Sequence, residues 1–504
     1  MADILTTRRF FIGGLASAFA IGPRRIFAAA PGEFSGGTPN LVFGLLSDVH
    51  VGLAKGGEGL DPTYDTSALV KAFEWFRDNG ADAVVIAGDM AHHGLVDELK
   101  AVADAWYGVF PNDKAPDGRR VERVFVFGNH DWDGINRGKR VYLEKADPKF
   151  AICTDAKRHW DEFFHEEWTP IFAKQVKGYD FVGIHWCACG DCRGRDEVFA
   201  RGMKEFYDSL KKPFDPSRPF FHVQHPHPKA TVHGERVWGQ DDGLSGSILS
   251  AHPNAIAFSG HSHTTLTDER SIWQGAFTSV GCGSLRNISP LFPGAVVPPP
   301  EGYENYNTPK AQAKVGATKA LEAIWRMDCK HGQLVRVYGD RVVFSRREFV
   351  TGAQLGDDLV MPLPAAESRP FEFAGRLANA KAPAFPPDAK LAVKRTKGAL
   401  RGSKKRKVPV WEIVIPVPSA EPSVRVGAFD VTASGPDGFI KRFAMVNPSA
   451  RFPLSDSRTL EPATFRVACK RLPAGEIKFS VVAASCWGKR SEPLEATVQN
   501  ERKA

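Results

Sequence analysis

The sequence is poor in cysteine and lacks long apolar runs. Eight cysteines in 504 residues are too sparse for the disulfide framework of a small secreted domain. No segment is long and apolar enough to supply the roughly 20 residues that a membrane-spanning helix needs. The chain also has no internal repeat, which excludes a solenoid or propeller built from repeated units. We therefore expect a globular protein of two or three domains, without a membrane span in its mature form.

A strong net charge is missing as well. The formal net charge of +8 is modest for this length, and much of it is local. The stretch KRTKGALRGSKKRK, residues 394–407, has basic residues and no acidic one. We interpret it as a solvated linker or hairpin rather than as a patch that binds a polyanion, so no nucleic-acid partner is expected.

The N-terminus has the pattern of an export signal. In TTRRFFIGGLASAFAIG, Arg8 and Arg9 precede an apolar run that is too short to cross a bilayer but has the length of a signal-peptide core. Ala28 to Ala30 offer a cleavage site of small residues. Residues 1–30 resemble a twin-arginine signal peptide, which implies export in the folded state and a periplasmic or secreted location. A short membrane anchor and a disordered tail are the alternatives.

Residues 40–364 read as one α/β domain. Apolar β-type runs alternate with segments of helical periodicity, which is typical of a layered domain with helices covering a sheet. Residues 132–178 lack this alternation and are expected to be an inserted region of helix and loop. The stretch QLVRVYGDRVVFSRREF predicts a closing hairpin with its turn at Gly339 and Asp340.

The C-terminal part differs in composition and in its pattern of apolar residues. Pro and Ala are frequent in residues 365–384, which we interpret as a linker. Short strand-like runs with turns between them come next, and they predict a small all-β sandwich over residues 385–500. Its last segment, IKFSVVAASCWGKRSEPLEATV, resembles the closing strands of fibronectin type III domains. The sequence does not indicate the partner of this domain.

Polar side chains follow the apolar part of five core strands. Because sites in open α/β sheets form at the carboxyl ends of the strands, we expect these side chains to converge. Carboxylate, imidazole and amide groups together favour ions such as Zn, Mn and Fe, without thiolate ligands. Gly88, Gly128 and Gly260 provide the sharp exits from three of these strands. The converging residues are Asp48, His50, Asp89, Asn129, His130, Asp131, His225, His261 and His263.

These blocks carry a family resemblance. Asp-x-His, Gly-Asp, Gly-Asn-His-Asp, a lone His after a strand and Gly-His-x-His, in this order, are similar to the calcineurin-like metallophosphoesterases over residues 41–350. The resemblance implies a layered β-sandwich core flanked by helices. It also implies two divalent or trivalent metal ions (Mn, Zn or Fe) and hydrolysis of small-molecule phosphate monoesters or diesters by metal-bound hydroxide. A non-catalytic envelope or binding protein that retains the fold is the alternative.

The resemblance also implies a role for each residue. Asp48, His50 and His263 would bind the first ion and Asp89 would bridge both. His130 is the candidate catalytic residue beside the metals, and Asp131 would support the loop or orient a neighbour. The second ion would be held by Asn129, His225 and His261.

Three points in the pattern stay open. His222 and His227 compete with His225 for its ligand role, although His225 directly follows the apolar part of its strand. His92 stands where many relatives have Asp or Tyr, so that neither the purple acid phosphatase pattern nor the Ser/Thr phosphatase pattern is met. The cluster of Cys187, Cys189 and Cys192 lacks a fourth partner for a metal and is interpreted as a loop without chemistry. Their role is left open.

Overall fold

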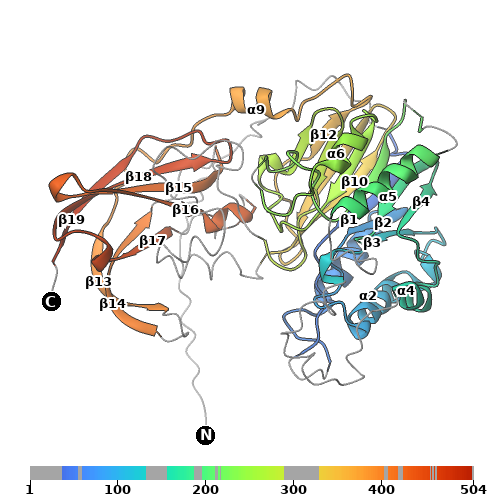
Figure 1. The fold of residues 1–504 in the computed structure, drawn as a ribbon, viewed down its shortest axis with the longest axis horizontal. Helices are drawn as coiled ribbons and strands as arrows, with labels where there is room; N and C mark the ends of the chain where they lie inside the picture. Colours follow the sequence, from blue (N-terminus) through green and yellow to red (C-terminus); the bar gives the residue numbers. More distant parts are fainter. Residues whose placement is uncertain are drawn as a thin grey trace, which may run out of the picture. The chain divides into compact units, whose positions relative to one another are not determined.

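In the computed structural model, described residues run from 37 to 501 with several gaps (Figure 1). The gaps are residues 55–58, 132–155, 187–195, 211–213, 216, 236, 289–328, 402–406, 418–423, 454–455, 457–458 and 460–461. The predicted signal peptide and the cluster of Cys187, Cys189 and Cys192 lie outside the described residues. None of the helices in the described part of the chain is long and apolar enough to span a membrane.

The first sheet of the N-terminal part has six strands in the order β12-β11-β10-β1-β2-β3. Strands β1, β2 and β3 are parallel, while β10, β11 and β12 are added in antiparallel pairing. The predicted hairpin at Gly339 and Asp340 is confirmed as the turn between β10 and β11. The strands are β1 (Leu41–Leu46), β2 (Ala83–Ala87), β3 (Glu122–Val126), β10 (His331–Val337), β11 (Arg341–Glu348) and β12 (Leu359–Pro362).

The second sheet also has six strands, in the order β4-β5-β6-β7-β9-β8. Strands β5, β6, β7 and β9 are parallel neighbours, and β4 and β8 close the two edges in antiparallel pairing. The strands are β4 (Ile171–Val176), β5 (Tyr179–Ile184), β6 (Phe220–Val223), β7 (Ala255–Ser259), β8 (Ile272–Gln274) and β9 (Thr278–Gly281).

The two sheets pack face to face around an aromatic centre. Phe43 of β1 meets Phe221 of β6 edge to face, with 4.9 Å between the ring centroids, and Phe181 and Phe258 at 5.3 and 5.6 Å. All four rings are buried in the core between the sheets. Edge-to-face pairs add about 0.5–1.5 kcal/mol each to the burial of their area. This packing brings the carboxyl ends of strands from both sheets to one edge.

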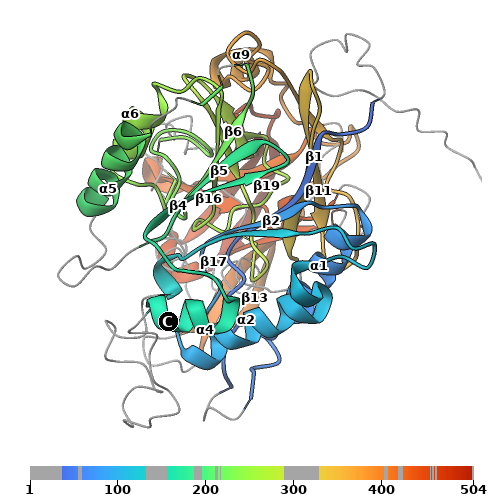
Figure 2. The same ribbon diagram turned by 90° about the vertical axis from the view of Figure 1, so that its right-hand side faces the viewer.

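Helices cover the outer face of each sheet (Figure 2). Helix α1 (Ser67–Asp78) buries Leu69, Ala72, Phe73 and Phe76, a spacing of three and four residues that makes one apolar stripe. The layered α/β core flanked by helices, predicted from the sequence, is confirmed. The other covering helices are α2 (Val96–Val109) and α4 (Ala156–Phe164) on the first sheet and α5 (Asp196–Ser209) and α6 (Leu244–Leu249) on the second.

Strand β4 differs from the prediction. The sequence predicts only helix and loop for residues 132–178, yet β4 lies in this range and pairs with β5 through the turn at Lys177 and Gly178. Most of its side chains are partly or fully exposed, because an edge strand is covered on one side only. Its sequence IFAKQV therefore shows little of the continuous apolar character that marks the central strands.

The C-terminal strands form two antiparallel sheets, β13-β14-β17 and β16-β15-β18-β19, preceded by helix α9 (Phe373–Asn379). Ile413 and Phe465 from the first sheet and Phe429 and Phe479 from the second lie in one buried core. The small all-β sandwich is thereby confirmed. The strands are β13 (Lys394–Arg401), β14 (Lys407–Val417), β15 (Val426–Ser434), β16 (Ile440–Val446), β17 (Ala463–Ala468), β18 (Gly475–Ser485) and β19 (Leu494–Asn500).

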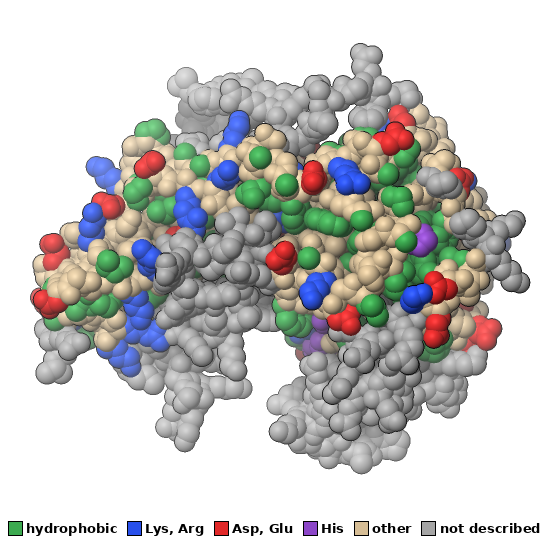
Figure 3. Space-filling view, turned by 45° about the horizontal axis from the view of Figure 1, so that its top comes forward, with side chains coloured by type: hydrophobic (Ala, Val, Ile, Leu, Met, Phe, Trp, Pro, Cys, Tyr) green, Lys and Arg blue, Asp and Glu red, His purple; other side chains and the backbone are tan. Residues whose placement is uncertain are grey.

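The basic run at residues 394–407 belongs to this sandwich. Strands β13 and β14 pair from Lys394 opposite Val414 to Arg401 opposite Lys407, so the run forms a hairpin, as one of the two interpretations predicted. On the face drawn in Figure 3, several described Lys and Arg side chains lie side by side at the lower left, and others are interspersed with Asp and Glu.

Candidate metal centre

The predicted ligands follow their strands in an unusual backbone conformation. Asp48 and His50 after β1 have φ of 51° and 52°, and Asp89 after β2 has φ of 54°. His261 and His263 after β7 have φ of 70° and 53°. This left-handed region is rarely occupied by residues other than glycine, and such strain gathers at functional sites. The chain therefore holds these side chains in place against a local preference.

The first group of ligand atoms belongs to Asp48, His50, Asp89 and His263, all within 4.8 Å of one another. The Nε2 atoms of His50 and His263 are 3.1 Å apart. Asp48 Oδ1 lies 3.1 Å from His263 Nε2, and Asp89 Oδ2 lies 3.5 Å from His50 Nε2. Ligands about 2.1 Å from one ion lie roughly 3 to 4 Å from each other. The four residues fit one metal ion.

The second group consists of Asp89, His225 and His261, again with ligand atoms within 4.8 Å. His225 Nε2 is 3.3 Å from Asp89 Oδ2, the same oxygen that faces His50 in the first group. Asn129 begins a helical turn after β3, and the N–H of the next residue, His130, donates to Asp89 Oδ1 at 2.8 Å. Asp89 is the one residue common to both groups.

Several ligand atoms are buried without a hydrogen bond. The buried side-chain atoms without a hydrogen-bond partner in the described residues include Asp48 Oδ1, Asn129 Oδ1 and His225 Nε2, along with atoms elsewhere in the fold. Such atoms normally cost about 1–3 kcal/mol each, so a structure retains them where a ligand satisfies them. All three belong to the predicted ligand set, and they are the atoms through which carboxylate, amide and imidazole bind metals.

The outer atoms of the same side chains are engaged by the protein. His225 Nδ1 donates to the Ala87 carbonyl at 2.8 Å, which makes Nε2 the nitrogen that can bind a metal once its proton is lost. His263 Nδ1 lies 3.2 Å from Asn287 Oδ1, and Asp48 Oδ2 accepts the His261 N–H at 2.9 Å. Partners of this kind orient metal ligands and set the histidine tautomer.

Two glycines make the close approach possible. Gly88, with φ of 90°, lies so close to His225 that a Cβ atom would overlap the imidazole ring. A Cβ atom at Gly260 would overlap Ser47 and the carboxylate of Asp48. The strand exits inferred from the sequence are therefore also contact points between the two sheets at the site.

Most of the ligand side chains hold the charge state that metal binding requires. Burial alone would raise the pKa of Asp89, but the charges of His225 and His130 hold it well below its usual range. Burial lowers the pKa of His261 to about 3 and keeps its imidazole neutral. His225 is the exception: burial opposes its charge, yet the carboxylate of Asp89 raises its pKa to about 9. A metal ion would displace this proton.

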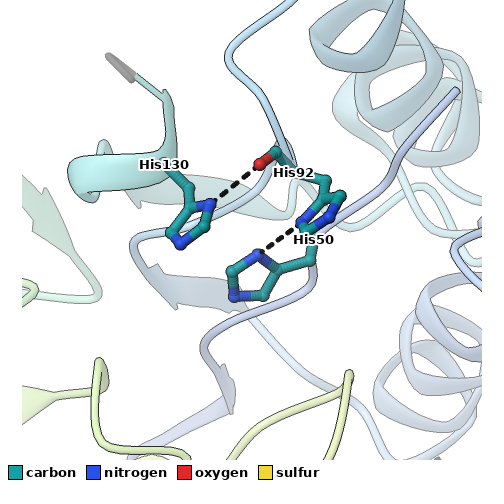
Figure 4. A group of neighbouring side chains, drawn as sticks. All are labelled: His50, His92 and His130. Carbon is teal, nitrogen blue, oxygen red and sulfur yellow. Dashed lines mark hydrogen bonds between the residues drawn. The ribbon is translucent and has the colours of Figure 1, made fainter. Parts of the chain in front are cut away.

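His92 and His130 lie next to the first group (Figure 4). His130 Nδ1 donates to the backbone carbonyl of His92 at 2.8 Å. The His92 Nδ1 atom is 3.4 Å from the outer nitrogen of His50, and the His92 ring stacks on Tyr64 at 4.6 Å. Nitrogen atoms of His50, His92 and His130 also lie within 4.8 Å of one another and form a third possible ligand group. His92 is thus placed as a neighbour of His50, and its carbonyl orients His130.

The hydrogen bonds of His222, His225 and His227 distinguish which of the three can bind a metal. Both nitrogens of His227 are taken, by Ser259 and Ser262 at 2.7 Å each. His222 is bound to Tyr207 and Gln224. Only His225 of the three directs a nitrogen without a hydrogen bond into the site. The Asp131 carboxylate accepts the N–H groups of Ala91 at 2.8 Å and Gly128 at 2.7 Å, so it ties two ligand loops together.

Residues 41–265 match the family of calcineurin-like phosphoesterases. This part of the chain is a calcineurin-like phosphoesterase domain. The match includes Asp48, His50, Asp89, His225 and His263, whose convergence fits the divalent metal ions that the phosphoesterase family implies. The domain is therefore one of a family of phosphoester hydrolases.

A search of curated proteins finds no match. Solved structures that match this chain include a predicted phosphoesterase from Streptococcus pneumoniae, at 10% identity over 64% of this chain and 97% of that chain, with a TM-score of 0.26. A purple acid phosphatase from yellow lupin has 12% identity over 64% of this chain and 54% of its own, with a TM-score of 0.36. Vps29 with Zn²⁺ from Entamoeba histolytica has 9% identity, 64% and 99% coverage, and a TM-score of 0.25.

The sequence did not point to three residues beside the phosphoesterase site. Arg286 donates to Tyr64 OH at 3.1 Å and lies 3.5 Å from His50 Nδ1. Asn287 holds His263. Arg286 and Asn287 sit in the stretch GSLRNIS, which has no motif that marks it. Only the pairing of β9 next to β7 brings them to the ligands.

Proposed function

We propose that the protein is an exported phosphoesterase with two metal ions, which hydrolyses phosphate monoesters or diesters. The observation that supports it most is the shared position of Asp89 between two groups of ligand atoms. Asp48, His50 and His263 would complete the first site, and Asn129, His225 and His261 the second. Carboxylate, imidazole and amide ligands suit Mn, Zn or Fe.

When bound, two such ions polarise a phosphoryl group, lower the pKa of water and neutralise developing charge. The chain supplies the rest. Asp89, with Oδ1 held by the His130 N–H, fixes the spacing of the two ligand groups. The His92 carbonyl accepts from His130 Nδ1, so Nε2 is the nitrogen that gives a proton to the leaving oxygen when both ring nitrogens carry a proton. The carbonyl takes the orienting place that a carboxylate side chain has beside some catalytic histidines.

The competing function is a non-catalytic binding protein that retains the fold. A scaffold that had lost catalysis would be free to lose ligands, yet all seven predicted positions carry a metal-binding side chain. The unpartnered buried atoms of Asp48, Asn129 and His225 favour a bound metal for the same reason. The hydrolase is therefore the better account.

The test combines metal analysis with hydrolysis. The purified mature chain is loaded with Mn, Zn or Fe, analysed for bound metal and assayed on nitrophenyl phosphate and bis-nitrophenyl phosphate. We expect about two metal ions per chain and turnover of at least one ester. His130→Ala is expected to keep the metals and lose roughly 10²–10⁴ in rate. A chain that binds two metals but hydrolyses neither ester would support the binding protein instead.

The N-terminal segment and the C-terminal sandwich complete the proposal. Arg8 and Arg9 support export through the twin-arginine route, with a periplasmic or secreted product. Replacing both by Lys is expected to leave the protein in the cytoplasmic fraction, and unchanged export would contradict the assignment. The closing strands of the sandwich support a fibronectin type III-like domain whose partner is a separate question.

A further inference from the structure

Trp238 is the most exposed large apolar side chain in the described part of the protein. Its exposed fraction is 65%, against 63% for Ile440, 46% for Val350 and 40% for Leu244. Tryptophan is usually well buried, because its large apolar surface is costly to leave in water. The exposed ring lies beside the candidate metal centre: its centroid is 4.3 Å from that of His261, at an interplanar angle of 30°. A solvent-exposed aromatic surface thus borders the second ligand group.

The backbone that carries Trp238 is firmly held. The Gln240 side chain donates to the carbonyls of Gly234 and Val237 at 2.8 and 3.0 Å and accepts the Ala230 N–H at 2.9 Å. The Gly239 carbonyl accepts the His227 N–H at 2.8 Å. These bonds close the loop on both sides of the tryptophan. The exposure of the ring is therefore not the result of a loosely attached loop.

Gly239 brings this loop directly onto the metal ligand. Its φ is 92°, and a Cβ atom there would lie 2.9 Å from Cδ2 of His261. Any other residue would push the loop away from the imidazole. The chain thus has a glycine next to Trp238 at a point where the loop contacts the imidazole of His261.

The surroundings of the two ligand groups differ in character. Trp186 is half-buried and lies 5.7 Å from the His261 ring and 6.1 Å from the His225 ring, so a second indole borders the second group. The first group is bordered by a cation, Arg286, which packs over Tyr64. Charge on one side suits phosphoryl oxygens, and aromatic surface on the other suits a flat apolar group.

We propose that Trp238 is a stacking platform and that the substrate is a phosphate ester carrying a planar aromatic group, with a nucleobase as the representative case. The inference rests on the proposed phosphoesterase function and adds the class of its substrate. A fixed, exposed indole offers its face without an ordering cost, and stacking of a base on an aromatic side chain strengthens binding by roughly 5- to 150-fold. Trp238 would determine specificity and take no part in the chemical step.

The test compares two ligands that differ only in the base. Phosphonate analogues of adenosine 5′-monophosphate and of ribose 5-phosphate, which have a P–C bond that is not hydrolysed, are titrated by calorimetry into the metal-loaded full chain. We expect the adenosine compound to bind about tenfold more tightly. Trp238→Ala should remove this preference, and Trp238→Phe should keep most of it. Leu244→Ala, an exposed apolar residue of the same segment, should leave it unchanged.

Each outcome has a distinct meaning. Equal binding of the two ligands to the wild type would overturn the proposal, as would a preference that persists in Trp238→Ala. If Trp238→Ala weakened both ligands equally and lost metal in elemental analysis, the residue would only support His261, and the platform would be refuted. A wild type that holds two metals and hydrolyses nitrophenyl phosphate without any base preference would refute this inference alone. A chain without metal or turnover would refute the proposed function itself.

Discussion

The Nδ1 atom of His50 lies 3.4 Å from the Nδ1 atom of His92 (Figure 4), while His50 Nε2 faces Asp48, Asp89 and His263. A histidine that binds a metal through Nε2 carries its proton on Nδ1. His50 would then donate to His92, which must hold its own proton on Nε2. This contact gives the imidazole at position 92 a role in orienting His50.

The contact predicts the effect of His92→Ala. Without its acceptor, His50 loses its orientation, and metal affinity at the first site should fall about 10- to 100-fold. The affinity is measured by competition with a chelator. The exposed His165, whose ring lies beside Tyr107 of helix α2, provides the matched control His165→Ala, for which we expect no change. Equal affinity in the His92 variant and the wild type would show that His50 is held by other contacts.

His225 and His227 form a second matched pair, two residues apart on the same segment. His225→Ala should reduce the bound metal from about two ions to one, because its Nε2 faces Asp89 and has no hydrogen bond. His227→Ala should keep both ions, because both of its nitrogens are bound to serines. Elemental analysis of the two folded variants shows which of the two histidines binds a metal ion. Loss of metal in the His227 variant only would reverse the assignment.

The two variants also show what the sequence left undecided. His222, His225 and His227 lie within a few residues of one another at the end of strand β6, and local pattern alone ranks them only by distance from the apolar run. Their partners come from β7, from α5 and from the Asp89 loop, which are far away in sequence. The choice among them depends on long-range packing.

His185 predicts a dependence of stability on pH. Burial, with a smaller contribution from the charge of Lys174, lowers its pKa to about 3. Its Nδ1 accepts the Phe127 N–H at 3.0 Å, which requires the neutral ring. The unfolded chain takes up a proton near pH 6.5 and the folded chain does not, so stability falls as the pH drops from about 6.5 towards 3.

Between pH 7 and 5 this residue alone should cost about 2 kcal/mol in the free energy of unfolding. The measurement is urea unfolding of the wild type and His185→Gln at both pH values. Gln keeps an acceptor for Phe127 and cannot be protonated, so the variant should lose less stability on acidification. An identical loss in both proteins would mean that His185 does not titrate in this range.

Asp268 and Arg270 form a buried ion pair outside the set of predicted metal ligands. Disrupting this pair should lower the unfolding free energy of the domain. Arg270 Nη2 donates to Asp268 Oδ2 at 2.6 Å and its Nε donates to Oδ1 at 2.9 Å. Asp268→Asn removes the carboxylate charge that is paired with the buried guanidinium of Arg270, and the unfolding free energy should fall by about 3–5 kcal/mol. Urea unfolding measures it.

The control for this prediction is the exposed pair of Lys100 and Asp104, one turn apart on α2. Asp104→Asn should change the unfolding free energy by no more than about 0.5 kcal/mol, because water screens the pair. Similar losses in the two variants would show that burial of the Asp268 pair has no special energetic weight.

The sequence by itself determined the layers and the residues that end the strands. Apolar runs of β1, β2, β3, β6 and β7 identify buried strands, and the polar residue after each run marks its carboxyl end. Edge strand β4 could not be predicted in this way, because only one side of it is covered and its pattern is weak. Periodicity reports burial, so it identifies the central elements best.

Only the tertiary structure decided which atoms meet. His50 and His263 are separated by 213 residues and come from different sheets, yet their Nε2 atoms are 3.1 Å apart. The common position of Asp89, the contact of His92 with His50 and the exposed ring of Trp238 over His261 likewise result from the packing of the two sheets. Local sequence sets the direction of a strand and the residue at its end, but distances across the site depend on long-range packing that no local pattern encodes.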